Sequence, residues 1–238
     1  MFNDSFKKTT IMKQRLSLLF GFLFALATAS AQPEVGSLFL TPHVGFNAST
    51  LLGDADVRVQ YVWDDGMGAA VTSRTLPKLG FNGGLGLEYQ LRKKWAISVG
   101  VDVNELGVRF KDFTLDDHTI SNAYIRLCYI NVPVLWKYYV NDWLALGVGL
   151  QPGYMLSKNA YADFSRGGGY TVSSSADDFQ HFDLSLPLSA SVFSAERMFY
   201  ELRCNLGISN LIQGYWIPFP LSCYNESLTF AIGYRFQL

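Results

Sequence analysis

Carboxylates and a histidine gather in stretches of the chain that are rich in Gly, Ser and Asn. Asp117-His118 and the acidic pairs Asp64-Asp65 and Asp177-Asp178 offer residue types that can activate a water molecule for hydrolysis. The same stretches also contain Asp54, Asp56, Asp112, Asp116 and Asp163. Acidic residues also commonly form solvated turns, and divalent cations can bridge carboxylates to anionic lipid headgroups. A hydrolase at the rim of the fold is therefore one hypothesis among three.

A second set of charges lies within segments in which apolar residues alternate with small or polar ones. The parity of the alternation places these charges on the polar face, near His43 and His181. They are Glu88, Asp102, Arg109, Lys137, Asp183, Glu201, Arg203 and Arg235. The two signs nearly balance, and charges in a low-dielectric interior must be paired or hydrogen-bonded. We expect a structural ladder of paired charges, with a gated polar pathway and catalysis as the alternatives.

Eight segments have the two-residue period of β-strands and are long enough, or nearly so, for a tilted membrane crossing, which needs about 9 to 11 residues. They cover residues 37–49, 79–91, 95–111, 123–139, 143–155, 179–192, 198–210 and 228–237. In the third segment the parity slips between Val103 and Leu106, which predicts a β-bulge near Asn104 and Glu105. The pattern predicts an all-β fold, an eight-stranded antiparallel up-and-down transmembrane barrel.

The end of the chain alternates without a break. Its apolar face predicts a C-terminal assembly strand of an outer-membrane barrel. That face carries Leu228, Phe230, Ile232, Tyr234, Phe236 and Leu238.

Short and long connections alternate along the chain, which is typical of periplasmic turns and external loops and leaves both termini in the periplasm. The short connections are residues 92–94, 140–142 and 193–197, and the long ones are residues 50–78, 112–122, 156–178 and 211–227. Aromatic residues beside the short connections predict a periplasmic girdle. They are Trp95, Trp136, Tyr138, Trp143 and Tyr200.

The first 31 residues have the features of a secretory signal peptide. Lys7, Lys8, Lys13 and Arg15 precede the apolar residues 16–27, and Ala29-Ser30-Ala31 predicts cleavage before Gln32. Met12 is an alternative start, so translation of residues 1–11 stays open. The predicted domains are a signal peptide, residues 1–31, and a barrel, residues 32–238.

Composition narrows the class of protein. Side chains are 49% hydrophobic and only 16% charged, against about 25% charged in soluble domains. Removing the basic leader leaves an acidic excess, which argues against a nucleic-acid partner. Cys128, Cys204 and Cys223 have no metal-binding spacing, so small hydrophobic roles are expected.

A soluble, lipocalin-like barrel with its apolar face inward is the rival fold. Its outer surface would then consist of Gly, Ala, Ser and Asn with an isolated charge per strand, whereas a water-exposed face favours interspersed Lys and Glu. Small residues instead suit the narrow interior of an eight-stranded barrel. The membrane orientation is therefore favoured.

Three motifs resemble the small outer-membrane β-barrels of the Bacteroidota, the PorT-like or outer membrane protein beta-barrel domain family. The motifs are Thr41-Pro42-His43-Val44-Gly45-Phe46-Asn47, Asn131-Val132-Pro133-Val134-Leu135-Trp136-Lys137-Tyr138-Tyr139 and Leu202-Arg203-Cys204-Asn205-Leu206-Gly207-Ile208-Ser209-Asn210, together with the ending Gly233-Tyr234-Arg235-Phe236. The resemblance implies an eight-stranded outer-membrane barrel, with ties to secretion or gliding in some relatives. It supplies no catalytic residue.

We therefore expect a structural or interaction protein of the Gram-negative outer membrane, with a closed lumen and a role as subunit of an envelope or secretion assembly. No enzymatic activity, cofactor, metal site or nucleic-acid partner is expected. Expected partners are outer-membrane lipid, the barrel-assembly machinery during insertion, and envelope proteins that contact the external loops. An omptin-like rim hydrolase and a narrow channel are the alternatives.

Overall fold

The computed structural model describes residues 33–53, 58–62, 68–72, 75–115, 118–164, 170–174, 180–194, 197–211 and 223–238. Every regular element in these ranges is a β-strand, and they contain no helix long and apolar enough to cross a membrane. The predicted signal peptide lies outside the described residues. So do most of the loop acids: Asp54, Asp56, Asp64, Asp65, Asp116, Asp117, Asp177 and Asp178.

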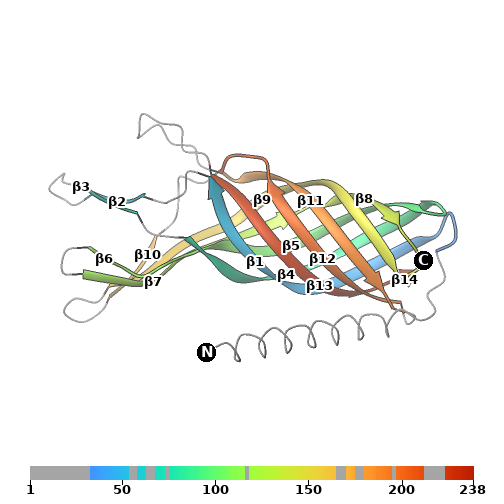
Figure 1. Cartoon of the computed structure of the whole chain (residues 1–238), viewed down its shortest axis with the longest axis horizontal. Helices are drawn as coiled ribbons and strands as arrows, with labels where there is room; N and C mark the ends of the chain where they lie inside the picture. Colours follow the sequence, from blue (N-terminus) through green and yellow to red (C-terminus); the bar gives the residue numbers. More distant parts are fainter. Residues whose placement is uncertain are drawn as a thin grey trace, which may run out of the picture.

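Eight antiparallel strands close in a ring (Figure 1). Two of them are interrupted, so that β7 continues as β8 and β13 as β14. Around the ring the order is β1 (Leu38–Gly53), β4 (Thr75–Arg92), β5 (Trp95–Phe110), β7 (His118–Asn131) with β8 (Val134–Tyr139), β9 (Leu144–Phe164), β11 (Phe182–Phe193), β12 (Met198–Gly207) and β13 (Cys223–Tyr234) with β14 (Phe236–Gln237). Each matches one predicted segment, so the predicted fold class is confirmed.

The ring closes where the first strand pairs with the last. Phe46 of β1 lies opposite Phe230 of β13, and the Leu238 amide donates to the Leu38 carbonyl at 2.9 Å. The C-terminal residue and the first described residues lie at the end of the barrel that carries the short turns (Figure 1). All six residues of the predicted apolar face point outward and are 37–69% exposed: Leu228, Phe230, Ile232, Tyr234, Phe236 and Leu238.

Proline explains the interruption between β7 and β8. Pro133 has no amide hydrogen for the ladder, and its carbonyl accepts from the Gly100 amide at 2.9 Å while Val132 donates to Pro152 at the same distance. The wall therefore stays hydrogen-bonded across the break.

The outward face is an apolar band, because alternate residues of every strand point away from the axis. Leu79 and Phe81 are 77% and 66% exposed in the isolated chain. Near the short turns, the Trp95 ring lies 5.8 Å from that of Trp136 and 4.7 Å from that of Tyr138, centroid to centroid. Trp143 and Tyr200, the other predicted girdle residues, also lie beside short turns.

The polarity of the two faces reverses toward the long-loop end. In β5 the inward residues change from Asp102 and Asn104 to the buried Leu106, Val108 and Phe110. The outward residues change over the same span, from Val101 and Val103 to Glu105 and Arg109. A polar exterior around an apolar interior suits water. The wall therefore continues beyond the apolar band.

This reversal corrects two predictions. The parity of β5 does not slip at Asn104 and Glu105; instead the step from Pro77 to Asn82 in β4 is one residue longer than the opposing step from Val108 to Asn104. Arg109 consequently faces outward and is exposed, so its predicted place in the lumen is wrong. The alternation of β5 is misleading because its apolar residues move from the outward to the inward face where the wall leaves the apolar band.

The predicted long loops are partly strands. Outside the ring, β6 (Phe113–Leu115) pairs with β7, and β10 (Tyr170–Ser174) pairs with β9. Because β7 and β9 stay paired as far as Ile120 and Phe164, these strands form an outer sheet in the order β6-β7-β9-β10. A separate hairpin joins β2 (Arg58–Val62) to β3 (Gly68–Thr72). Both structures project from the long-loop end (Figure 1).

Candidate functional site

Inward-facing charges from six strands form one connected network, which we call the lumen network. It consists of Glu88 (β4), Asp102 (β5), Lys137 (β8), Glu201 and Arg203 (β12), Arg235 (between β13 and β14) and His43 (β1). All seven side chains are buried. Strand alternation explains their common direction, since each belongs to the small and polar face of its strand.

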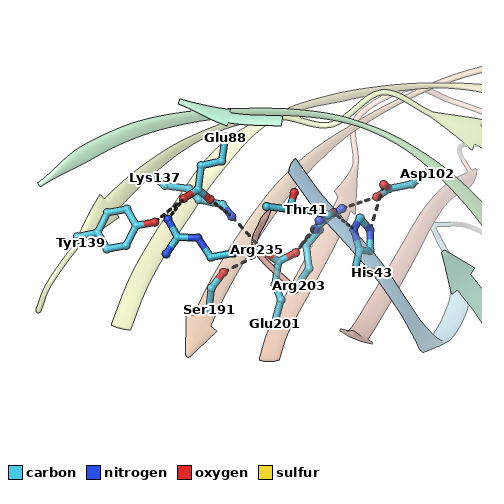
Figure 2. A network of polar contacts seen from close by, with 10 residues as sticks. All are labelled: Thr41, His43, Glu88, Asp102, Lys137, Tyr139, Ser191, Glu201, Arg203 and Arg235. Carbon is cyan, nitrogen blue, oxygen red and sulfur yellow. Dashed lines mark hydrogen bonds and ion pairs between the residues drawn. The ribbon is translucent and has the colours of Figure 1, made fainter. Parts of the chain in front are cut away.

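Glu88 is the centre of the half nearest the short turns. One carboxylate oxygen lies 3.0 Å from Lys137 Nζ. The other lies 3.0 Å from Arg235 Nη2 and accepts a hydrogen bond from the Tyr139 hydroxyl. Figure 2 shows these three donors converging on Glu88. Glu88 is thus a fully buried carboxylate whose two oxygens both have partners.

Aromatic rings hold the guanidinium of Arg235. Its Cζ lies 4.1 Å from the Phe39 ring centroid and 4.5 Å from the Phe193 ring centroid. Cation–π contacts of this kind strengthen when water is excluded. The rings therefore complete the surroundings of a cation that has one carboxylate partner.

Glu201 and Arg203 connect the two halves of the network. Glu201 Oε1 accepts two charge-assisted hydrogen bonds from the Arg203 guanidinium, from Nε at 2.9 Å and from Nη2 at 2.5 Å. Glu201 Oε2 accepts from Ser191 Oγ at 2.9 Å and lies 3.6 Å from Lys137 Nζ. Lys137 therefore bridges Glu88 and Glu201 (Figure 2).

Asp102 and His43 form the far end of the network. Arg203 Nη1 donates to Asp102 Oδ2 at 2.8 Å, and His43 Nε2 lies 3.2 Å from Asp102 Oδ1. His43 Nδ1 lies 3.2 Å from the Thr41 carbonyl oxygen. Carbonyl and carboxylate oxygens only accept. Both ring nitrogens of His43 thus lie beside oxygen acceptors, and a protonated ring would place its positive charge next to Asp102.

Glycines opposite the charged side chains provide the space that they occupy. A Cβ built on Gly84 would meet the Asp102 carboxylate, and one built on Gly147 would lie 2.5 Å from Ser189 Oγ and 3.4 Å from Lys137 Cγ. The small residues of the inward face are thus the counterpart of the long ionic ones. This complementarity follows from the narrow interior of an eight-stranded barrel.

Apolar clusters lie on both sides of the lumen network. At the short-turn end the cluster consists of Ala96, Tyr139, Ala145, Phe193 and Phe199. Toward the long loops there are two clusters, one of Leu51, Val108, Phe110, Leu211 and Cys223 and one of Leu106, Leu127, Tyr129 and Met155. The charges are therefore enclosed along the axis as well as by the wall.

Two predicted ladder members lie apart from the network. Asp183 is buried, and its carboxylate accepts from Ser209 Oγ at 2.7 Å and from Asn225 Nδ2 at 3.0 Å. Arg109 is on the outer wall. Without them, three carboxylates face Lys137, Arg203 and Arg235, so the network is neutral before His43 is counted.

Tyr139 and Ser191 belong to the network although they were not among the predicted site residues. The alternation places both residues on the inward face. Tyr139 follows Lys137 by two residues in β8, and Ser191 of β11 lies directly opposite Glu201 of β12. Their hydroxyls supply bonds that the ionic residues need. Predicting them requires knowledge of the cross-strand neighbours.

The described residues contain no group of three His, Cys, Asp or Glu side chains placed to hold a metal ion. Two described loop acids make local contacts: Asp112 Oδ1 accepts from the Asn122 amide at 3.3 Å, and Asp163 Oδ2 from Asn122 Nδ2 at 3.1 Å. Asp117, the first residue of the hydrolase motif, lies outside the described residues. Cys128, Cys204 and Cys223 are free thiols.

The sequence model of the outer membrane protein beta-barrel domain family matches residues 30–213. Among solved structures, Ail of Yersinia pestis is 15% identical, with a TM-score of 0.44 over 85% of this chain and 100% of that chain. OprG of Pseudomonas aeruginosa is 13% identical, with a TM-score of 0.42 over 87% and 99%. Neisserial surface protein A is 10% identical, with a TM-score of 0.40 over 84% and 97%. No curated protein matches the sequence significantly.

Proposed function

Because the chain belongs to the outer membrane protein beta-barrel domain family, we propose that this outer-membrane barrel is a closed anchor with a structural or interaction role. Its lumen is filled, and its activity resides in the surfaces that it presents outside the bilayer. It serves as a subunit of a larger envelope or secretion assembly, and it is not an enzyme. The motifs in β1, β8 and β12 support placing it among the PorT-like barrels of the Bacteroidota.

The enclosed lumen network is the observation that carries this proposal. Every carboxylate of the network lies within 3.0 Å of a lysine or arginine nitrogen, and apolar clusters flank the network on both sides. Moving such ions out of their pairs leaves uncompensated buried charge, which costs several kcal/mol per ion. A solute pathway along the axis would have to break these pairs.

The outer sheet is where a protein partner would bind. Within the described residues, β6 pairs only with β7, and β10 only with β9, so each leaves one edge unpaired. An unpaired edge offers amide and carbonyl groups to an added strand. We place this sheet outside the cell and both termini in the periplasm, since short turns are typical of the periplasmic end. Outer-membrane lipid surrounds the band, and the C-terminal strand is the segment offered to the assembly machinery.

The closed lumen predicts that the barrel does not conduct ions across a bilayer. Purified full-length protein in planar lipid bilayers is expected to show no steady, large conductance. The combined variant Glu88→Ala, Lys137→Ala, Arg235→Ala removes three long side chains from the axis and is expected to raise ion flux. Steady conductance from the unaltered monomer would contradict a closed anchor and favour the narrow channel.

The interaction role predicts a surface partner at the edge of the outer sheet. Thr114 is an exposed residue of β6, so Thr114→Cys on intact cells should react with a bulky, membrane-impermeant, cleavable cross-linker. One envelope protein is expected to be captured reproducibly. The unaltered protein reports the background from its three cysteines.

A matched control comes from the opposite end of the barrel. Lys93→Cys in the turn between β4 and β5 should react only after the outer membrane is permeabilised, because we place that turn in the periplasm. Reaction of Lys93→Cys on intact cells would reverse the proposed orientation. Labelling of Thr114→Cys without any captured protein would leave the barrel as a lone anchor and contradict the assembly role.

A further inference from the structure

An open groove of about 510 Å³ lies on the outer wall across β4, β5, β7 and β9. Its lining includes Lys78, Glu105, Arg109, Arg126 and Asp163, all charged residues. Gly107 lies between Glu105 and Arg109 in β5 and contributes no side chain there. A Cβ at Gly107 would meet the Ile125 carbonyl oxygen, so the backbone of β7 keeps this position a glycine.

The groove lies at the border of the apolar band. In β5 the exposed Val103 is followed on the same face by Glu105, and in β7 Cys128 is followed toward the long loops by Arg126. Leu79, which is 77% exposed, also lines the groove, and the exposed Phe81 follows it in β4 toward the short turns. A ligand in the groove therefore meets ionic groups on the side of the long loops and exposed apolar side chains on the side of the short turns.

The ionic groups of the groove leave an excess of positive charge. Glu105 Oε1 lies 2.6 Å from Lys78 Nζ and 3.3 Å from Arg126 Nε, so this carboxylate is already matched. Arg109 is exposed and has no ion-pair partner among the described residues. Asp163, the other acid, accepts a hydrogen bond from Asn122. Among the described residues, Arg109 thus has no ion-pair partner, and Arg126 pairs with Glu105 through Nε alone.

Arg109 and Arg126 are placed to hold one anion together. Gly107 pairs with Arg126 in the ladder, and Arg109 follows two residues later on the same face. Diagonal neighbours in adjacent strands lie about 7–8 Å apart, within reach of two arginine side chains converging on one group. Planar guanidinium groups suit phosphate oxygens in particular.

Two tyrosines border this pair of arginines. The Tyr124 and Tyr161 rings are stacked with centroids 5.0 Å apart and an interplanar angle of 19°. Arg126 Cζ lies 5.9 Å from the Tyr124 centroid. Aromatic side chains with a polar tip suit the headgroup level of a membrane, where one side is apolar and the other wet.

We infer that this groove binds the phosphate-bearing headgroup of an outer-leaflet glycolipid, with its acyl chains against Leu79 and the apolar band. Arg109 and Arg126 donate to the phosphate, and the tyrosines border the sugar. The assignment to the outer leaflet rests on the proposed orientation of the barrel. Binding itself depends only on the groove.

The experiment is a titration of the full-length barrel in detergent, followed by native mass spectrometry. The probes are phosphorylated lipid A and the same lipid A after enzymatic removal of its phosphates. The unaltered protein is expected to bind the phosphorylated form about tenfold more tightly, as two charge-assisted contacts predict for an exposed site. Arg109→Gln with Arg126→Gln is expected to lose that preference.

Two further variants separate the groove from general charge and folding effects. Arg109→Gln alone removes a side chain with no described ion pair. It is expected to weaken the binding of phosphorylated lipid A without changing the heat-dependent gel shift of the folded barrel. Arg92→Gln with Lys93→Gln removes the same charge at the short turns and is expected to bind like the unaltered protein.

Several results would overturn the inference. They are equal affinity of the unaltered protein for both forms of lipid A, unchanged binding by the double variant, or displacement of the lipid by millimolar inorganic phosphate, which would assign the groove to the free anion. Cross-linking of a partner at Thr114 is measured separately, so failure of the proposed interaction role and failure of lipid binding are distinguishable.

Discussion

Replacing Arg203 by methionine is expected to lower the free energy of unfolding by about 3 to 5 kcal/mol, the cost typical of removing one partner of a buried ion pair. Arg203 donates to Glu201 Oε1 through both Nε and Nη2, and to Asp102 Oδ2 through Nη1 at 2.8 Å. Methionine keeps most of the volume but leaves two buried carboxylates without their main counter-ion. Urea unfolding of the refolded barrel in micelles, followed by tryptophan fluorescence, measures the change.

The matched control is Arg109→Met, which removes the same functional group from the exposed outer wall. It is expected to change the stability by less than about 0.5 kcal/mol, as for most surface substitutions. Adding Glu201→Gln to Arg203→Met should recover part of the loss, because the amide carries no charge. Equal effects of Arg203→Met and Arg109→Met would show that the lumen network does not hold the barrel together.

Replacing Gly45 by alanine is expected to impair closure of the barrel. Gly45 lies in β1 opposite Ala231 of β13, and a Cβ on Gly45 would meet the Phe230 carbonyl oxygen and the Ala231 Cα. These are backbone atoms of β13, the strand that closes the ring with β1, and they cannot move away by a change of rotamer as a side chain can. We expect a loss of about 3 kcal/mol, the upper part of the range for overpacking, and a reduced yield of the heat-modifiable folded form.

Gly83→Ala provides the comparison for this substitution. Gly83 lies in the neighbouring strand β4, and its nearest atoms to a new Cβ are 3.8 Å away, which is ordinary contact. It is expected to fold like the unaltered protein. If both alanine variants gave the same yield and the same denaturant midpoint, the close approach of β1 and β13 would have no energetic consequence.

The eight crossing segments could be predicted because the two-residue alternation is a local property of each strand. The same alternation assigns Glu88, Asp102, Lys137, Glu201, Arg203 and Arg235 to the polar face, and all six side chains are buried in the structure. It failed for Arg109, since the parity was continued on the assumption that apolar residues always face lipid. In β5 that assumption ends at Val103, beyond which the apolar residues Leu106, Val108 and Phe110 form an interior core.

Partners within the lumen could not be predicted from spacing. Arg203 is separated from Asp102 by 101 positions and Arg235 from Glu88 by 147, so their meeting depends on the register of strands that are distant in the sequence. Asp183 shows the same limit, because it was expected in the ladder but bonds to Ser209 and Asn225. The bulge in β4 likewise depends on the pairing of β4 with β5.

The sequence by itself determined the strand number, the apolar and polar faces of the strands within the apolar band, and the closing strand at the C-terminus, because each of these follows from the two-residue alternation. Only the tertiary structure decided which ions meet, where the wall leaves the apolar band, and that Arg109 and Arg126 share an outer groove. These features depend on cross-strand register and on height along the barrel, which no local pattern encodes.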